Sequence, residues 1–154
     1  MPLAGAAAAA PEGQRWHDGV RFPYLGRVIT LRLEAHGRDA QLRGDELLLP
    51  LPPEADGRQI RDGAHAWLQT QARRVLEQRV HECARRLGLV PPPWQLSFAT
   101  ASWGEVDQAC RLRLAWRLIH LSLAEIDGVV VRQLSRLPRQ AAMSDLWSHV
   151  ELPA

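Results

Sequence analysis

The feature that most restricts the fold is a long helical pattern over residues 60–87. Apolar residues recur there mostly at steps of three and four, with Arg and Glu on the opposite face, as in a helix that buries one side. The apolar positions are Trp67, Leu68, Val75, Leu76, Val80, Cys83 and Leu87. Gly88 is a natural C-terminal stop and the prolines at 91–93 forbid continuation. The pattern predicts one long amphipathic helix.

The residues before this helix predict a sheet. Within residues 20–33, Ile29, Leu31 and Leu33 alternate with the period of two that is typical of a half-buried strand. Two shorter strands, 40–43 and 46–50, flank a turn at Gly44-Asp45, and three prolines at 50–53 then end the sheet. We therefore expect an antiparallel N-terminal sheet.

The residues after the long helix predict a second group of short elements. Residues 94–101 and 111–115 have the composition of strands, and residues 125–137 that of a helix. Residues 144–150 predict a last short helix, for which Ser144 is a candidate N-cap.

Length and composition indicate one soluble domain. The chain has 154 residues, of which 46% are hydrophobic and 23% charged. Residues 1–17, rich in alanine, predict a disordered tail, and residues 18–154 predict the domain. The tail has no positive charge before Arg15, which argues against a secretory signal. No run approaches the roughly 20 apolar residues of a membrane span, so we expect a cytoplasmic protein with no membrane partner.

The net charge and the cysteine positions argue against several classes of function. The net charge is +2, with arginine as the only positive side chain, which is too small an excess to favour nucleic acid as a partner. Cys83 and Cys110 show no C-x-x-C spacing and predict two reduced, buried thiols. Neither a Gly-rich phosphate loop nor a serine-hydrolase motif is present.

A further stretch carries a family resemblance. Residues 126–137 read IDGVVVRQLSRL and residues 144–147 read SDLW. This frame resembles the active-site helix of the YgjP-like zinc metallopeptidases, relatives of the SprT and WLM peptidases. In that family an apolar run leads into His-Glu-Leu-Ala-His-Leu. A third His follows six residues after the second, and then Phe-Trp.

Shorter motifs support the resemblance in order and spacing over residues 20–151. Tyr24-Leu25-Gly26 resembles the opening hairpin of the family, and Trp103-Gly104 its Trp-Gly-Ser-Cys. The run LAWRLI at 114–119 resembles Leu-Asn-Trp-Arg-Leu-Ile. The resemblance implies an α+β, zincin-like fold: an N-terminal antiparallel sheet, a long helix and the relic of an active-site helix.

The residues that would hold zinc are replaced. Without a gap, the first His falls on Arg132, the Glu on Gln133, the second His on Arg136 and the third His on Ala142. In H-E-x-x-H the two imidazoles bind one Zn²⁺ and the Glu is the general base. Arginine offers donors only, and glutamine cannot accept a proton from water near neutrality. We expect no zinc cofactor and no catalytic residue here, although the family would bind zinc.

Arg132 and Arg136 lie one helical turn apart in the pattern. If both face the former cleft, two guanidiniums converge there and can bind an anion such as a carboxylate or phosphate. They can instead pair with acids of the chain, or extend into solvent; the candidate acids are Glu105, Asp107 and Asp145.

Two functional hypotheses follow, from different classes. The first is a catalytically inactive homologue of a zinc metallopeptidase, retained as a binding or regulatory module for a protein or peptide partner. The alternative is a metal-dependent peptidase or hydrolase with relocated ligands, for example His120 or His149. A third hypothesis, a nucleic-acid accessory protein, is opposed by the near-neutral charge. The sequence does not identify the partner.

Overall fold

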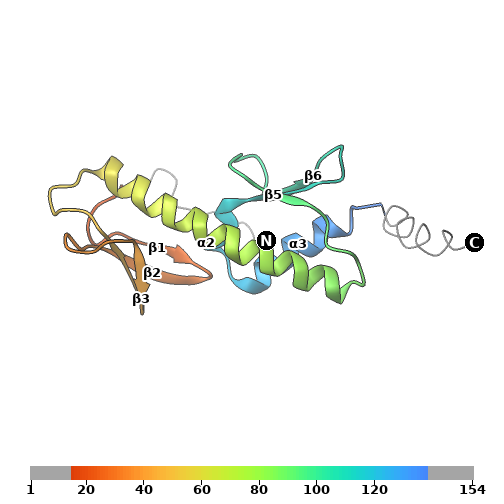
Figure 1. The fold of residues 1–154 in the computed structure, drawn as a ribbon, viewed down its shortest axis with the longest axis horizontal. Coiled ribbons are helices and arrows are strands. Elements are labelled where there is room, and N and C mark those ends of the chain that lie inside the picture. Colours follow the sequence, from red (N-terminus) through yellow and green to blue (C-terminus); the bar gives the residue numbers. More distant parts are fainter. Residues whose placement is uncertain (1–14, 139–154) are drawn as a thin grey trace, which may run out of the picture.

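The computed structural model describes residues 15–138, and a single long helix, α2 (Gly57–Arg86), runs along the length of this part (Figure 1). Asp56 caps its N-terminus: the carboxylate accepts a hydrogen bond from the Gln59 N–H, and the Gln59 amide oxygen accepts one from the Asp56 N–H. This reciprocal pair satisfies two N–H groups that the helix leaves unbonded. Beyond the other end Gly88 has a φ of +70°, so the predicted helix and its stop are both confirmed.

The first half of α2 packs on a four-stranded sheet with the strand order β1-β2-β4-β3. The strands are β1 (Arg21–Tyr24), β2 (Arg27–Leu33), β3 (Gln41–Arg43) and β4 (Glu46–Leu49). The predicted hairpins are present, but the prediction of a wholly antiparallel sheet is wrong. After the β3–β4 turn, β4 enters between β3 and β2, so it runs parallel to β2 with Leu31 opposite Leu47.

A three-stranded sheet with the order β5-β7-β6 lies beside the second half of α2 (Figure 1). Its strands are β5 (Trp94–Ser97), β6 (Gly104–Val106) and β7 (Leu112–Ala115). The predicted strands at 94–101 and 111–115 are confirmed, although both are shorter than expected. β6 was not predicted; it pairs antiparallel with β7, whereas β5 pairs parallel with it.

The chain then forms a short 3₁₀ helix, η1 (Trp116–His120), and the helix α3 (Leu123–Leu134). η1 packs against α2 and β1, while α3 packs against α2, β6 and β7. Both sheets and all three helical segments therefore share one hydrophobic core. Within residues 15–138, no helix has the length and apolar character needed to cross a membrane.

Three local features refine the sequence analysis. Trp16, which the predicted boundary assigns to the tail, is buried against Phe22 and His65. The packed part of the chain therefore begins before residue 18. Cys83 is buried as predicted, but Cys110 is only half-buried, in a turn with a φ of +59°.

Candidate functional site

The helix α3 carries Arg132 and Gln133, the positions at which the resemblance places the first zinc ligand and the general base. Ser122 caps it: the Ser122 hydroxyl accepts a hydrogen bond from the Glu125 N–H, and the Glu125 carboxylate accepts one from the Ser122 N–H. The helix therefore starts earlier than the predicted residue 125. The signal was present, because Ser122-x-x-Glu125 before an apolar run is a capping box.

Gln133 belongs to the buried face of α3, with 6% of its surface exposed. It lies in the row of inward-facing residues Ile126, Val129, Val130, Gln133 and Leu134, whose spacing of three and four predicts one helix face. The side chain passes over Gly104 of β6: a Cβ added to Gly104 would lie 3.2 Å from Cγ of Gln133. A larger residue at position 104 would therefore require Gln133 and Leu114 to shift by a few tenths of an ångström.

The amide oxygen of Gln133 is buried and has no hydrogen-bond partner among the described residues. A buried acceptor without a donor raises the free energy of the folded state by about 1–3 kcal/mol. A carboxylate in the same place would also carry an uncompensated charge. The neutral amide is therefore the form of this side chain that the packing tolerates.

Arg132 and Arg136 do not lie together on one regular turn of helix. α3 ends at Leu134, and Arg136 lies in the following turn, where its N–H donates to the Gln133 carbonyl at 3.0 Å. The predicted helix over 125–137 is therefore too long at its C-terminal end. Both arginine side chains are exposed.

The predicted internal partners of these arginines are not engaged by them in the described part of the chain. Asp107 accepts hydrogen bonds from the Ala109 and Arg111 N–H groups, and its carboxylate lies 3.9 Å from the Arg111 guanidinium. Neither Arg132 nor Arg136 forms an ion pair with Glu105 or Asp107. Asp145 and Ala142 lie outside the described residues, as does the predicted helix at 144–150.

The side chains at the former ligand positions do not fit zinc. Arg132 and Arg136 have no lone pair to donate to a metal, and Gln133 directs its side chain into packing with Gly104. Within residues 15–138 there is no group of three or more His, Cys, Asp and Glu side chains that could hold a metal ion.

His120, one of the proposed relocated ligands, is buried at the end of η1. Its Nδ1 lies 2.7 Å from the Pro23 carbonyl oxygen, which can only accept, so Nδ1 carries the proton and Nε2 has the lone pair. Nε2 has no partner among the described residues. Burial lowers the pKa of His120 to about 4, with a further lowering from nearby His65. His149, the other proposed ligand, lies outside the described residues.

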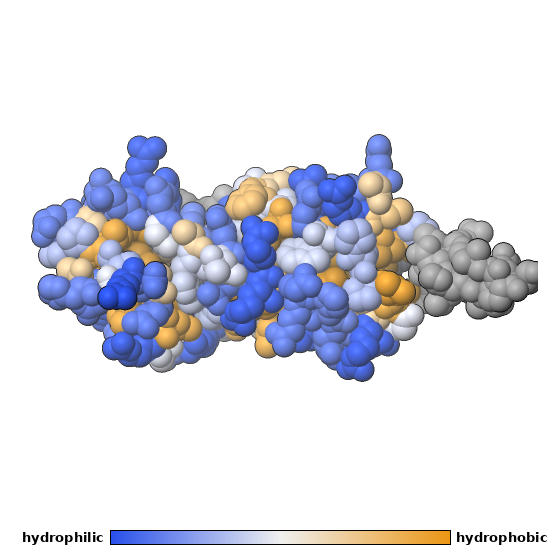
Figure 2. All heavy atoms as spheres, in the orientation of Figure 1, coloured by the Kyte–Doolittle hydropathy of each residue, from blue (hydrophilic) through white to orange (hydrophobic). Residues whose placement is uncertain are grey.

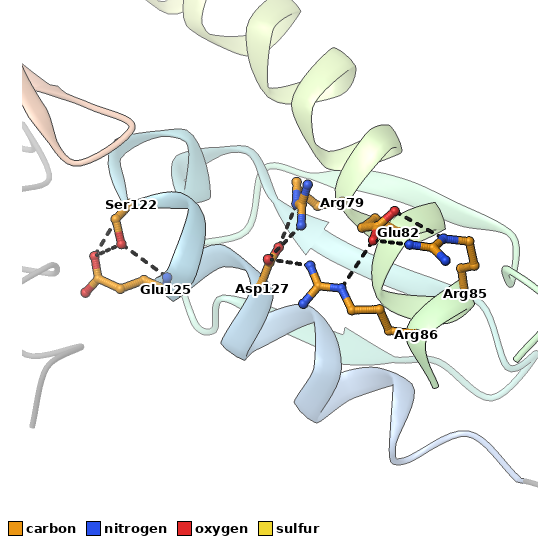
Figure 3. A network of polar contacts seen from close by, with 7 residues as sticks. All are labelled: Arg79, Glu82, Arg85, Arg86, Ser122, Glu125 and Asp127. Carbon is orange, nitrogen blue, oxygen red and sulfur yellow. Dashed lines mark hydrogen bonds and ion pairs between the residues drawn. The ribbon is translucent and has the colours of Figure 1, made fainter. Parts of the chain in front are cut away.

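An ion pair that the sequence did not reveal joins α3 to α2 (Figure 3). Arg79 donates from Nε and Nη2 to the two carboxylate oxygens of Asp127, each at 2.7 Å. This two-point hydrogen bond stabilises the charged guanidinium and raises the pKa of Arg79. Arg86 approaches the same carboxylate at 3.4 Å. Asp127 thus anchors α3 through charge, next to the buried face that contains Gln133.

The outer edge of β6 is a second feature of the site. The backbone N–H of Asp107 donates to the Arg111 carbonyl, and the backbone N–H of Ala115 donates to the Trp103 carbonyl. In the β6–β7 ladder, the residues that bond to β7 are therefore the odd-numbered residues of β6 and of the positions beside it. In an antiparallel pair the alternate residues direct their N–H and C=O groups away from the partner strand. These residues are Gly104 and Val106, and no described strand pairs with that edge.

Comparison with known proteins agrees with this arrangement. A family model described as the YgjP-like metallopeptidase domain matches residues 3–134. Searches among curated proteins and among solved structures each found no match. Together with the two sheets and the helices α2 and α3, the match confirms the predicted α+β fold class.

Proposed function

The chain belongs to the YgjP-like metallopeptidase family, and from this premise we propose that it is a catalytically inactive member that binds an extended segment of a protein or peptide. The observation that carries the proposal is the state of α3. Arg132 on α3 and Arg136 in the turn after it are exposed, while Gln133, at the position of the general base, is buried as a neutral amide. Position 133, where the resemblance places the general base that activates water, therefore carries no acid–base group.

The edge of β6 supports the binding function. Gly104 and Val106 direct backbone donors and acceptors outward, and an extended peptide can continue the sheet by pairing with them. Gly104 on this strand lies against the side chain of Gln133, since a Cβ at Gly104 would lie 3.2 Å from Cγ of Gln133. Main-chain hydrogen bonds of this kind give affinity that depends little on the side chains of the peptide.

Exposed charge supports a preference for acidic segments. Arg132 and Arg136 flank Gln133, and neither forms an ion pair with a described residue. Guanidinium groups bind carboxylates with two parallel hydrogen bonds, which lysine cannot form. The proposed ligand is therefore an extended segment that carries Asp or Glu.

Metal content tests the loss of catalysis. The full chain is offered zinc, desalted, and its bound metal measured by mass spectrometry; we expect far less than one zinc per chain. Digestion of an unfolded protein substrate, measured with and without a chelator, is expected to be absent under both conditions. One tightly held zinc per chain together with chelator-sensitive digestion would overturn the proposal in favour of a hydrolase with relocated ligands.

Peptide affinity tests the binding function. The probe is a fluorescent glutamate-rich decapeptide, with a lysine-rich decapeptide as the comparison. We expect Arg132→Ser with Arg136→Ser to weaken binding of the acidic peptide at least tenfold. Arg43→Ser with Arg58→Ser removes the same charge from exposed arginines at the other end of the molecule and should have little effect.

A backbone variant separates strand pairing from charge. Val106→Pro removes an N–H that points away from β7 and leaves the bonded pairs of the ladder intact. We expect it to weaken binding of the acidic peptide and to change the unfolding midpoint of the protein only slightly. Unchanged affinity in Val106→Pro would exclude pairing along this edge.

A further inference from the structure

An apolar groove lies where the ends of α2 and α3 meet. The loop after α2 forms one wall and the end of α3 the other, around a cavity of about 90 Å³. The lining residues are Leu87, Leu89, Val90, Leu134, Ser135, Leu137 and Pro138. In Figure 2, hydrophobic residues reach the surface at this end of the molecule. All but one of the lining side chains are apolar, so the groove favours an apolar occupant.

Two apolar side chains at the rim of the groove are largely exposed to solvent. Leu87 is 42% exposed and Val90 is 60% exposed. Single exposed apolar residues are common, but here two of them border an apolar hollow. A segment that covers them removes apolar surface from water, and this burial stabilises the docked state.

The chain itself supplies a candidate to cover the groove. Pro138 lines the cavity, and 16 residues, 139–154, follow it in the sequence. Within them Met143, Leu146, Trp147 and Val150 have the spacing of zero, three, four and seven that indicates one apolar face of a helix. Seven residues lie between Pro138 and Leu146, and the eight steps reach at most about 29 Å, long enough to turn back.

We propose that residues 144–150 form an amphipathic helix that packs its apolar face into this groove of the same chain. Ser144 is the N-cap, and Asp145 in the first turn interacts favourably with the helix dipole. The groove and the segment are adjacent in the sequence, so docking within one chain closes only a short loop, at low entropic cost. This inference does not depend on the proposed peptide binding at β6.

Hydrogen exchange of the full-length protein tests the docking. We expect the backbone N–H groups of residues 144–150 to exchange at least tenfold more slowly than those of a synthetic peptide of residues 139–154. Trp147→Ala should abolish this protection. Ser148→Ala, on the opposite face of the expected helix, should preserve it.

Variants of the groove keep the test independent of the segment. Val90→Asp changes a side chain that the described residues leave largely exposed, so the domain should still fold. We expect it to remove the protection of residues 144–150. The double variant with Trp147→Ala should lower the unfolding midpoint by less than the sum of the two single variants. Fast exchange in the unmodified chain, or protection that survives Val90→Asp, would overturn the proposal.

Measurement of the molecular mass in solution decides which chain occupies the groove. A monomer that retains the protection at all concentrations supports docking within one chain. Protection that appears only with a concentration-dependent dimer would show that a second copy supplies the helix, which contradicts the proposal as stated.

Discussion

The guanidinium of Arg79 on α2 holds the carboxylate of Asp127 on α3 through two hydrogen bonds of 2.7 Å. Their side chains are 15% and 20% exposed, so water screens this pair only in part. The pair fixes α3 against α2. It is an electrostatic anchor on the same helix that carries Arg132 and Gln133.

Asp127→Asn should lower the free energy of unfolding by about 1–3 kcal/mol, because it leaves Arg79 partly buried without its counter-charge. Urea denaturation measures the loss. The matched control is the pair of Arg27 with Asp45, whose side chains are 48% and 74% exposed. Asp45→Asn should cost less than about 1 kcal/mol. Equal losses in the two variants would contradict the anchoring role of Asp127.

Gln133→Glu should destabilise the protein by about 1–3 kcal/mol at pH 8, because the new carboxylate is buried beside Gly104, where the present side-chain oxygen has no hydrogen-bond donor among the described residues. Burial raises the pKa of a glutamate above its unfolded value of about 4.3. The folded state then binds more protons, so stability is lost as pH rises. The deficit relative to the unmodified chain should therefore grow between pH 4 and pH 8.

Gln133→Met is the companion variant, since it keeps the shape of the side chain and removes the unbonded amide oxygen. We expect it to be neutral or to stabilise the protein by up to about 1 kcal/mol. A loss of several kcal/mol would mean that the amide oxygen has a partner outside the described residues.

His120 should make the protein labile in mild acid. Burial lowers its pKa to about 4 in the folded state, whereas the unfolded value is about 6.5. The unfolded state binds the proton first as pH falls, so stability is complete above pH 6.5 and is lost between about pH 6.5 and 4. The shift corresponds to about 3 kcal/mol.

The urea midpoint between pH 8 and pH 4 measures this effect. His120→Gln can still donate to the Pro23 carbonyl but does not titrate, so its stability should fall less steeply with acid. His36→Gln, at an exposed site, should leave the profile of the unmodified chain unchanged. Parallel profiles for His120→Gln and the unmodified chain would sink this assignment.

Gly26→Ala should destabilise the protein by about 2 kcal/mol or more. Gly26 has a φ of +83°, and a Cβ there would lie 2.9 Å from Cβ and 3.0 Å from Cα of Ser122, the N-cap of α3. Gly44→Ala is the control, because Gly44 has a φ of +61° but nothing within 4 Å. It should show the backbone strain alone, about 1 kcal/mol. Thermal unfolding compares the two, and equal effects would show that contact with Ser122 adds nothing.

The helices were predictable because their signals are local. The apolar spacing and Gly88 gave the extent of α2 to within a few residues. The Ser122-x-x-Glu125 capping box is a local signal for the start of α3 as well.

Strand partners were not predictable in the same way. The alternation in β2 and β4 indicates strands, but it does not encode that β4 inserts beside β2 in a parallel register. β6, with only three residues around Gly104, has too few positions to show a period.

At the candidate site, the sequence shows which residues stand at the ligand positions of the family. It does not show where the fold places their side chains. The apolar spacing of Ile126, Val129 and Val130 extends to position 133, so the burial of Gln133 was within reach of the sequence. The Arg79–Asp127 pair joins residues 48 apart in the sequence and depends on how two helices cross. No local pattern encodes such a contact.

For the inactive family member that we propose, the burial of Gln133 also imposes an order on an evolutionary return to metal chemistry. Histidines at positions 132 and 136 would enter exposed sites, where a single substitution has little effect on folding. A glutamate at 133 that arrived before them would meet a stability barrier, because no cation would yet be bound beside it. The two histidines must therefore appear before the glutamate. A lineage that acquires the glutamate first loses stability and is removed by selection.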